Sequence, residues 1–264
     1  MQDGGEAFAR RVEDACLTAW PAVRHAFYDG WLLRFAGGHT RRANSVNALR
    51  RGAHDLGDKI RYCETAYRRQ ALPAIFRVFS FTEPELDGAL DAAGYGPAED
   101  ETRVIHMDTA KLGGIEASAE VVIESAPSDA WFAAQAKCGG LDALAQAEQR
   151  SILGALAVPA FFAAARAPNG RLASLACGAV HDAVTCINLV VTDPAWRRCG
   201  LSRRAVSTVL AHARDRAGAT GACLAVVAAN TPAIALYRRL GFRTELYRYH
   251  YRRRLPYRSA LWMR

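Results

Sequence analysis

Residues 192–203 of this chain read TDPAWRRCGLSR and join an apolar stretch, residues 183–192, to an amphipathic one, residues 201–217. The apolar stretch predicts a buried strand, and the amphipathic stretch predicts a helix. The apolar stripe of that helix consists of Leu201, Ala205, Val209 and Ala213. The first N–H groups of a helix have no partner within it and lie at the positive end of its dipole, so they can bind an anion such as a pyrophosphate. Gly200 lets the loop approach a ligand closely, and neutralising charge comes from Arg197, Arg198 and Arg203.

A second motif lies further along the chain, at residues 230–242, which read NTPAIALYRRLGF. Thr231 as N-cap, Pro232 in the first turn and Gly241 at the end predict a short helix. Residues 222–227 predict a strand before this helix, and residues 242–251 predict one after it. No G-x-G-x-x-G pattern accompanies the two motifs, which disfavours a dinucleotide as the ligand.

Glycines and prolines divide the rest of the chain into predicted elements. Helices are expected at residues 6–19, 83–93, 128–138 and 141–156. Strands are expected at residues 74–81, 102–107 and 120–124. Two hairpins are expected, one from residues 29–35 and 43–46 with Gly37 and Gly38 in the turn, the other from residues 160–166 and 172–180. Residues 108–119 are the best linker candidate, because they are small, glycine-containing and without periodicity.

An internal repeat supports a division at this linker. Residues 86–95 and the strand after them echo residues 235–242 and the final strand, since in both a helix ends in a glycine–aromatic pair and leads into a strand. We therefore expect a duplicated fold, with one domain at residues 1–112 and another at 113–264.

Taken together, the two motifs resemble the GNAT superfamily of N-acetyltransferases. Arg197-x-x-Gly200-x-Ser202 is similar to the pyrophosphate loop of that family, with a serine at the last small position. The pattern from Asn230 through Tyr237 to Gly241 is similar to its final helix. The resemblance covers residues 120–253 and implies an α/β fold, in which helices flank a mixed, largely antiparallel central sheet. Residues 1–112 resemble a degenerate copy, so the GNAT fold is expected in tandem.

The resemblance implies transfer of an acetyl group from acetyl-CoA to a primary amine of a small molecule or peptide, without a metal. The strand at residues 188–191 would splay from that at 222–227 and pair with the pantetheine arm. The residues implied there are Leu189, Val190 and Val191. The pyrophosphate loop would comprise Arg197, Arg198, Cys199, Gly200, Leu201, Ser202 and Arg203. Asn230 would bind the pantetheine, and Tyr237 would bind the cofactor and protonate the departing thiolate as general acid.

The general base is not identified by the sequence. Many family members carry a glutamate on the strand before the phosphate loop, but here Thr185 stands at about that position. His181 and Asp182 are alternatives, although a surface turn suits both better. A water chain or a residue of the N-terminal half is the remaining option. That half has no phosphate cradle in residues 46–56, and its hairpin residues that could reach an acceptor are Trp31, Arg34, Arg41, Arg42 and Asn44. Core packing suits Trp31 at least as well, and exposure to solvent suits the arginines at least as well.

Composition limits the function classes. Hydrophobic residues make up 51% and charged residues 23%, an ordinary globular balance, and neither a membrane span nor a secretion signal is recognisable, so a cytoplasmic protein is expected. The seven cysteines are scattered and never form a C-x-x-C pair, which argues against a disulfide framework or a zinc knuckle. Cys177, Cys186 and Cys223 fall in apolar stretches and suit small buried hydrophobes.

Two other function classes remain open. The first is a sensor that binds acyl-CoA without turnover, which the missing strand carboxylate favours. The second is a nucleic-acid binder, suggested by a net charge of +8 and six arginines after residue 247, although no nucleic-acid-binding motif accompanies them. We therefore do not expect nucleic acid as a partner, and a homodimer is compatible with the sequence.

Overall fold

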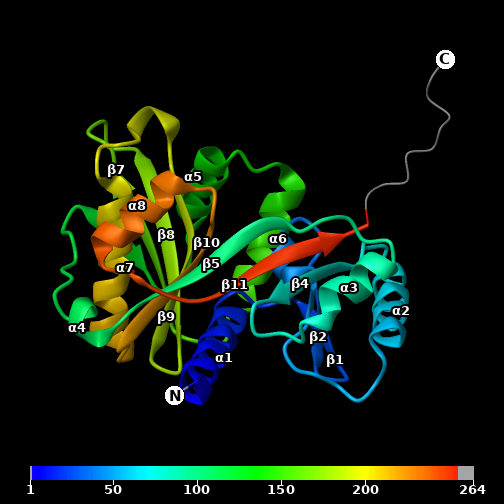
Figure 1. The fold of residues 1–264 in the computed structure, drawn as a ribbon. Coiled ribbons are helices and arrows are strands. Elements are labelled where there is room, and N and C mark those ends of the chain that lie inside the picture. The colour runs from blue at the N-terminus through cyan, green and yellow to red at the C-terminus, as the bar shows by residue number, and fades with distance from the viewer. Residues whose placement is uncertain (1, 255–264) are drawn as a thin grey trace. The chain divides into compact units, whose positions relative to one another are not determined.

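The computed structural model describes residues 2–254, and its helices and strands divide into two compact units (Figure 1). Unit 1 consists of residues 2–23 and Thr102–Arg248. Unit 2 consists of Arg24–Glu101 and residues 249–254. Both units combine a sheet with helices, which confirms the predicted α/β class.

Unit 1 is built on a mixed sheet with the strand order β11-β5-β10-β9-β8-β7-β6. Its strands are β5 (Glu99–Met107), β6 (Val121–Glu124), β7 (Ala160–Arg166), β8 (Leu172–His181), β9 (Val184–Thr192), β10 (Gly221–Val227) and β11 (Thr244–Arg253). The pairs from β6 to β9 are antiparallel, β9 and β10 are parallel, and β10 and β5 are antiparallel. The mixed, largely antiparallel sheet is therefore present as predicted.

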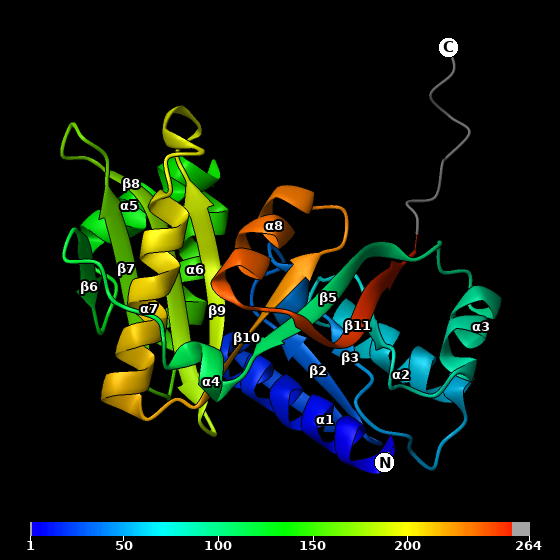
Figure 2. The same cartoon turned by 60° about the vertical axis from the view of Figure 1, so that its left-hand side comes forward.

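Helices cover both faces of this sheet (Figure 2). One face carries α7 (Leu201–Ala217) and α8 (Thr231–Leu240), and the short α4 (Thr109–Leu112) in the predicted linker lies against α7. The other carries α1 (Gln2–Ala19), α5 (Asp129–Gly139) and α6 (Ala143–Gly154). The predicted stripe of α7 is buried, since Ala205, Val209 and Ala213 are all fully covered in the core of the unit.

Unit 2 has the strand order β1-β2-β3-β4-β11. Its own strands are β1 (Arg24–Tyr28), β2 (Trp31–Phe35), β3 (Val46–Asn47) and β4 (Ile75–Phe79), and its helices are α2 (Leu56–Arg68) and α3 (Glu85–Ala92). β2 and β3 form the predicted antiparallel pair, but β1 and helix α2 were not predicted. β1 joins β2 through Asp29 and Gly30, both at positive φ, which makes a tighter hairpin than the one expected at Gly37 and Gly38.

The units differ from the predicted domains 1–112 and 113–264 because strands are exchanged across the linker. β5 comes from the first half of the sequence, yet residues 102–107 pair with β10 in the sheet of unit 1. Conversely, residues 249–253 at the end of β11 pair with β4 in unit 2. α1 also belongs to unit 1, where Val12 and Ala15 are fully buried.

The predicted internal repeat recurs as a matching structural corner. Gly94 follows the end of α3 and Gly241 follows the end of α8, both at positive φ. In each case the next N–H reaches back five residues, from Tyr95 to the Leu90 carbonyl and from Phe242 to the Tyr237 carbonyl. Tyr95 and Phe242 are buried after the turn. Each corner then leads into one of the two exchanged strands.

Candidate active site in unit 1

The parallel pair of strands β9 and β10 separates at one end. The described pairing runs from Val184 and Gly221 to Ile187 and Leu224, while β9 continues to Thr192 and β10 to Val227. Beyond Ile187 the facing backbone groups of the two strands are therefore not paired with each other, as the sequence led us to expect for residues 188–191.

A β-bulge in β9 follows this separation. Against β8, Asn188 pairs with Cys177 and Val191 with Leu175, so β9 carries one extra residue between them. Leu189 adopts a positive φ of 54°, which is uncommon for a branched side chain. The buried Gln135 of α5 donates from Nε2 to the Leu189 carbonyl at 3.3 Å and supports the bulge from the α5 face. Leu189, Val190 and Val191 are all half-buried along this stretch.

The loop after β9 is held in place by its own residues. The Asp193 carboxylate accepts a hydrogen bond from the Ala195 N–H at 3.0 Å, and Trp196 packs against the core of the unit. Arg198 and Gly200 both have positive φ, and Gly200 is the N-cap of α7 without a side chain to cap it. The first N–H groups of α7 therefore remain available at the positive end of the helix.

The charged side chains of this loop face solvent. Arg197, Arg198 and Arg203 are exposed, as is Cys199, and none of the three arginines forms an ion pair with a described residue. Their charge is thus not neutralised within the described chain. An anion at the start of α7 would meet both helix dipole and guanidinium groups.

Ser202, the unusual residue of the loop motif, has a structural role. Its hydroxyl lies 2.6 Å from the Thr192 hydroxyl, which lies 2.8 Å from that of Ser174. Ser174 in turn donates to the Val191 carbonyl at 2.9 Å. This chain of hydrogen-bonded hydroxyls connects the start of α7 to strands β8 and β9. Because the Ser202 hydroxyl bonds to Thr192, it does not occupy the backbone N–H of Ser202. Leu201 is buried beneath it.

Unit 2 contains the equivalent helix start, and there the position is filled by the protein itself. β3 and β4 are a parallel pair joined through α2, as β9 and β10 are joined through α7. The N-cap of α2 is Asp55, whose carboxylate accepts hydrogen bonds from the Gly57 and Asp58 N–H groups. The anion position of unit 2 is therefore occupied by a carboxylate, in agreement with the predicted lack of a phosphate cradle.

The second motif lies on α8. Asn230, rather than the predicted Thr231, is the N-cap, and its Oδ1 accepts a hydrogen bond from the Ala233 N–H at 3.2 Å. Asn230 is exposed, whereas Tyr237 is buried in the core and contacts Phe242 edge-on. Burial raises the pKa of Tyr237 to about 12, so the phenol stays protonated at neutral pH. The matching corner in unit 2 has Leu90 in place of Tyr237.

None of the proton acceptors considered from the sequence lies at the strand separation. Thr185 is fully buried on the α7 face, with its methyl group toward Gly178. His181 is the last residue of β8 and is half-buried, whereas the exposed Asp182 lies in the turn to β9 and forms an ion pair with Arg11 that lowers its pKa. The expectation of a surface turn is thus confirmed for Asp182, but not for His181.

The hairpin residues of the N-terminal half mostly have partners inside unit 2. Trp31 is fully buried against Phe76, so its predicted alternative of core packing holds. Arg34 is buried and donates to the Arg42 carbonyl, and Asn44 accepts from the Ala36 N–H. Arg41 pairs with Glu99 and Asp100.

The basic C-terminal residues are also paired. Four of the six arginines lie in the described chain, and each forms an ion pair with a carboxylate: Arg248, Arg252, Arg253 and Arg254. Arg258 and Arg264 lie outside the described residues. This pairing weakens the case for nucleic-acid binding through this segment, because its guanidinium groups already have intramolecular partners.

Comparison with known proteins identifies the family. The family described as "Probable histone acetyltransferase Rv0428c C-terminal" matches residues 7–254. The chain belongs to this family. It is thereby a GNAT protein, as the motifs led us to expect, and no curated protein matches it. Within the described residues, none of the helices has the length and apolar character needed to span a membrane.

Solved structures show the same fold at low sequence identity. A GCN5-related N-acetyltransferase from Kribbella flavida has a TM-score of 0.71 at 18% identity, covering 94% of this chain and 96% of that one. A tandem GNAT protein from the clavulanic acid biosynthesis pathway has a TM-score of 0.60 at 14% identity, covering 86% and 78%. A GCN5-related N-acetyltransferase from Sphaerobacter thermophilus has a TM-score of 0.56 at 18% identity, covering 79% and 71%.

Proposed function

We propose that this GNAT protein moves the acetyl group of acetyl-CoA to a primary amine of a small molecule or peptide by direct transfer. The observation that carries the proposal is the combination, within unit 1, of two separating strands with an uncapped, arginine-flanked helix start directly after one of them. The separated strands suit an extended arm that contains amides, and the helix start suits a pyrophosphate. Coenzyme A carries these two groups next to each other along the molecule.

Each predicted residue then has a defined task. The backbone groups of Leu189, Val190 and Val191 that are not bonded within the chain, as the Leu189 and Val191 carbonyls are, pair with the pantetheine amides as an added strand would. The N–H groups from Arg198 to Arg203 hold the pyrophosphate, with the Arg197, Arg198 and Arg203 side chains around it. Asn230 lies at the start of α8, where its Nδ2 can donate to the pantetheine while its Oδ1 caps the helix.

In the chemical step the amine nitrogen attacks the thioester carbon, the carbon–sulfur bond breaks and the sulfur takes up a proton. Tyr237 supplies that proton in our proposal, because its raised pKa keeps the phenol protonated until the thiolate forms. The amine proton leaves through water, since β9 carries no carboxylate along its length. Placing the two reactants next to each other contributes the remainder of the acceleration.

Cofactor binding is tested by calorimetric titration of acetyl-CoA into the native protein and into Gly200→Glu. The added carboxylate would repel the pyrophosphate, so binding should be lost. Gly218→Glu is the matched control, because Gly218 ends the same helix, also has positive φ and also has open space around its Cβ position. Equal affinity in the native protein and Gly200→Glu, or no binding to either, would refute the site.

A sensor that binds acyl-CoA without turnover is the second candidate, and the absence of a carboxylate on β9 favours it. Tyr237→Phe separates the two functions. For a transferase we expect thiol release to fall by about 100-fold or more at nearly unchanged acetyl-CoA affinity. Tyr67→Phe, at a buried tyrosine of unit 2, is the control and should leave turnover intact. Acetyl-CoA binding without thiol release across an amine panel would identify the sensor.

A further inference from the structure

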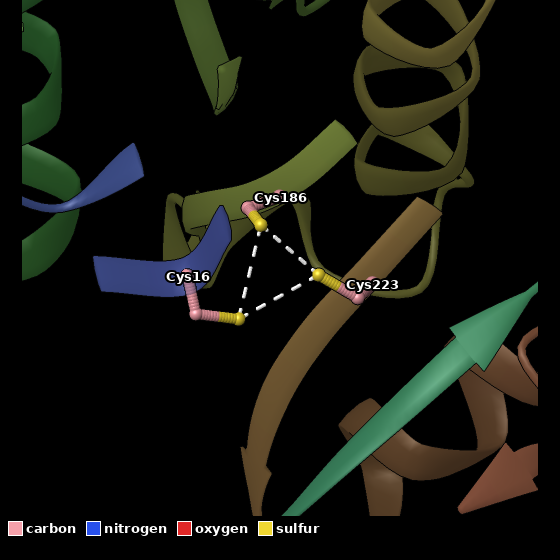
Figure 3. Close-up of side chains that lie close together, drawn as sticks. All are labelled: Cys16, Cys186 and Cys223. Atoms are coloured by element: carbon pink, nitrogen blue, oxygen red, sulfur yellow. Dashed lines mark hydrogen bonds between the residues drawn. The ribbon is translucent and has the colours of Figure 1, made fainter. Parts of the chain in front are cut away.

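Three cysteine thiols converge in the interior of unit 1 (Figure 3). Cys186 and Cys223 have sulfurs 3.0 Å apart, Cys16 lies 3.6 Å from Cys223, and Cys186 lies 3.7 Å from Cys16. Exposed fractions are 6% for Cys16, 2% for Cys186 and 0% for Cys223. Burial of Cys186 and Cys223 was expected from the sequence, but their meeting with Cys16 was not.

The cluster lies where the two strands of the candidate active site begin to separate. Cys186 on β9 and Cys223 on β10 are register partners, one pair before the last described pair of Ile187 and Leu224. Cys16 approaches them from α1, in the layer that covers this face of the sheet. The three thiols therefore connect a helix and both strands at the apex of the opening between β9 and β10.

All three thiols are buried, and burial disfavours the charged thiolate form. Hydrogen bonds from Cys16 and Cys186, together with burial, raise the pKa of Cys223 well above its ordinary value. Among the described residues, no histidine, aspartate or glutamate joins the three sulfurs as a fourth ligand. The site thus offers three neutral soft donors in a dry environment, where a net charge would be costly.

We propose that these three thiols form a binding site for trivalent arsenic, held as a neutral tris-thiolate. Arsenous acid is uncharged at neutral pH and reacts as As(OH)₃ + 3 RSH → As(SR)₃ + 3 H₂O. Three As–O bonds break and three As–S bonds form, and each thiol proton leaves with a hydroxide as water. Arsenic and sulfur keep their oxidation states, and no charge is buried at any stage.

Charge and coordination number distinguish this occupant from common thiophilic metals. Zinc takes four ligands in structural sites, and only three donors are present here. Copper(I) suits thiolates, but three thiolates around it would leave two negative charges in the interior. A tetrahedral zinc site shows how far apart thiolate sulfurs lie when they share one centre: about 3.8 Å for bonds of about 2.3 Å. The three sulfur–sulfur distances in this cluster are 3.0, 3.6 and 3.7 Å, so the thiols can bind one central atom with little rearrangement.

Binding would fasten α1 to β9 and β10 by three covalent bonds. We therefore expect a higher melting temperature for the arsenic-bound protein, whether or not the strands accept coenzyme A. This readout is independent of the proposed acetyl transfer.

The test uses the full-length reduced protein and sodium arsenite as the probe. Native mass spectrometry should show one arsenic atom gained and three hydrogens lost, and X-ray absorption should show three As–S bonds without As–O bonds. Cys16→Ala is the main variant, because alanine favours a helix and α1 should still form. We expect its arsenite affinity to fall by about tenfold or more, and the gain in melting temperature to disappear.

Cys63→Ala is the matched control, at a fully buried cysteine in the core of unit 2, and should bind as the native protein does. Cys223→Ala and Cys186→Ala should reproduce Cys16→Ala, with circular dichroism confirming their fold. Absence of arsenite binding, an adduct that retains an As–O bond, or unchanged binding in Cys16→Ala would each overturn the proposal. Tighter binding of copper(I) than of arsenite would refute the charge argument behind it.

Discussion

Residues 113–264 alone should not form a stable protein, although they contain both GNAT motifs. Removing residues 1–112 takes away β5 and α1, which both belong to unit 1. Strand β10 loses the ladder from Ala222–Met107 to Val227–Thr102, which comprises six residue pairs. At one hydrogen bond per pair and about 0.5–1.5 kcal/mol each, the ladder contributes roughly 3–9 kcal/mol.

Side-chain burial adds to this loss. Val104, Ile105 and Met107 of β5 are buried in unit 1, and burying each such side chain stabilises a protein by about 1.5–3 kcal/mol. Since whole domains are stable by only about 5–15 kcal/mol, the fragment is expected to lack a cooperative unfolding transition. Its exposed β10 edge should also favour aggregation.

The assay compares the isolated fragment with a chain cut at the same place. A protease site inserted between Leu112 and Gly113 allows the full-length protein to be folded first and cleaved afterwards. The cleaved protein should keep its two pieces together, melt cooperatively and bind acetyl-CoA as the intact protein does. A fragment 113–264 that melts cooperatively and binds acetyl-CoA by itself would refute the role we give to β5.

Three further predictions concern single side chains. Ser202→Ala should lower the free energy of unfolding, measured in urea, by about 1 kcal/mol because it removes the hydrogen bond to Thr192. Its acetyl-CoA affinity should stay almost unchanged, because the backbone N–H of residue 202 remains. A large loss of affinity would show instead that the Ser202 hydroxyl binds the cofactor. Asp55→Ala should destabilise the protein by about 1 kcal/mol by uncapping α2, and an unchanged urea midpoint would contradict that role. With its pKa at about 12, Tyr237 should cause no loss of turnover up to roughly pH 11. Its contribution to stability is complete below the ordinary tyrosine pKa near 10 and is lost as the pH rises toward 12; a tyrosine-dependent fall in turnover near pH 9 would contradict the assignment.

Local signals allowed the sequence to predict much of unit 1. The apolar stretch before Thr192, the stripe of α7 and the glycine end of α8 each depend on neighbouring residues, and all three recur in the structure at the predicted positions. In unit 2 the β1–β2 turn was missed, although Asp29-Gly30 is a strong hairpin signal. β1 reads RHAFY and is largely exposed, so it lacks the apolar alternation that marks a half-buried strand.

Features that depend on distant pairing could not be predicted. The similarity between the residues that lead up to Tyr95 and those that lead up to Phe242 predicts an internal repeat. It does not predict which sheet the strand after each of them joins. Gln135 reaches the Leu189 carbonyl from a helix in which no motif marks it. Cys16 and Cys186 are separated by 170 positions, so no spacing rule links them. The hydroxyl of Ser202 is paired by Thr192, a contact that neither motif implies.

The exchanged strands also bear on the evolution of this protein. After a duplication, a copy that loses its ligand is ordinarily free to decay or to be deleted. Here the half whose helix start is closed by Asp55 provides the strand that borders β10, and the half with the open helix start provides the strand that borders β4. Natural selection on either sheet would therefore act on both halves, so a half without a phosphate cradle would be retained because the other half depends on its strand.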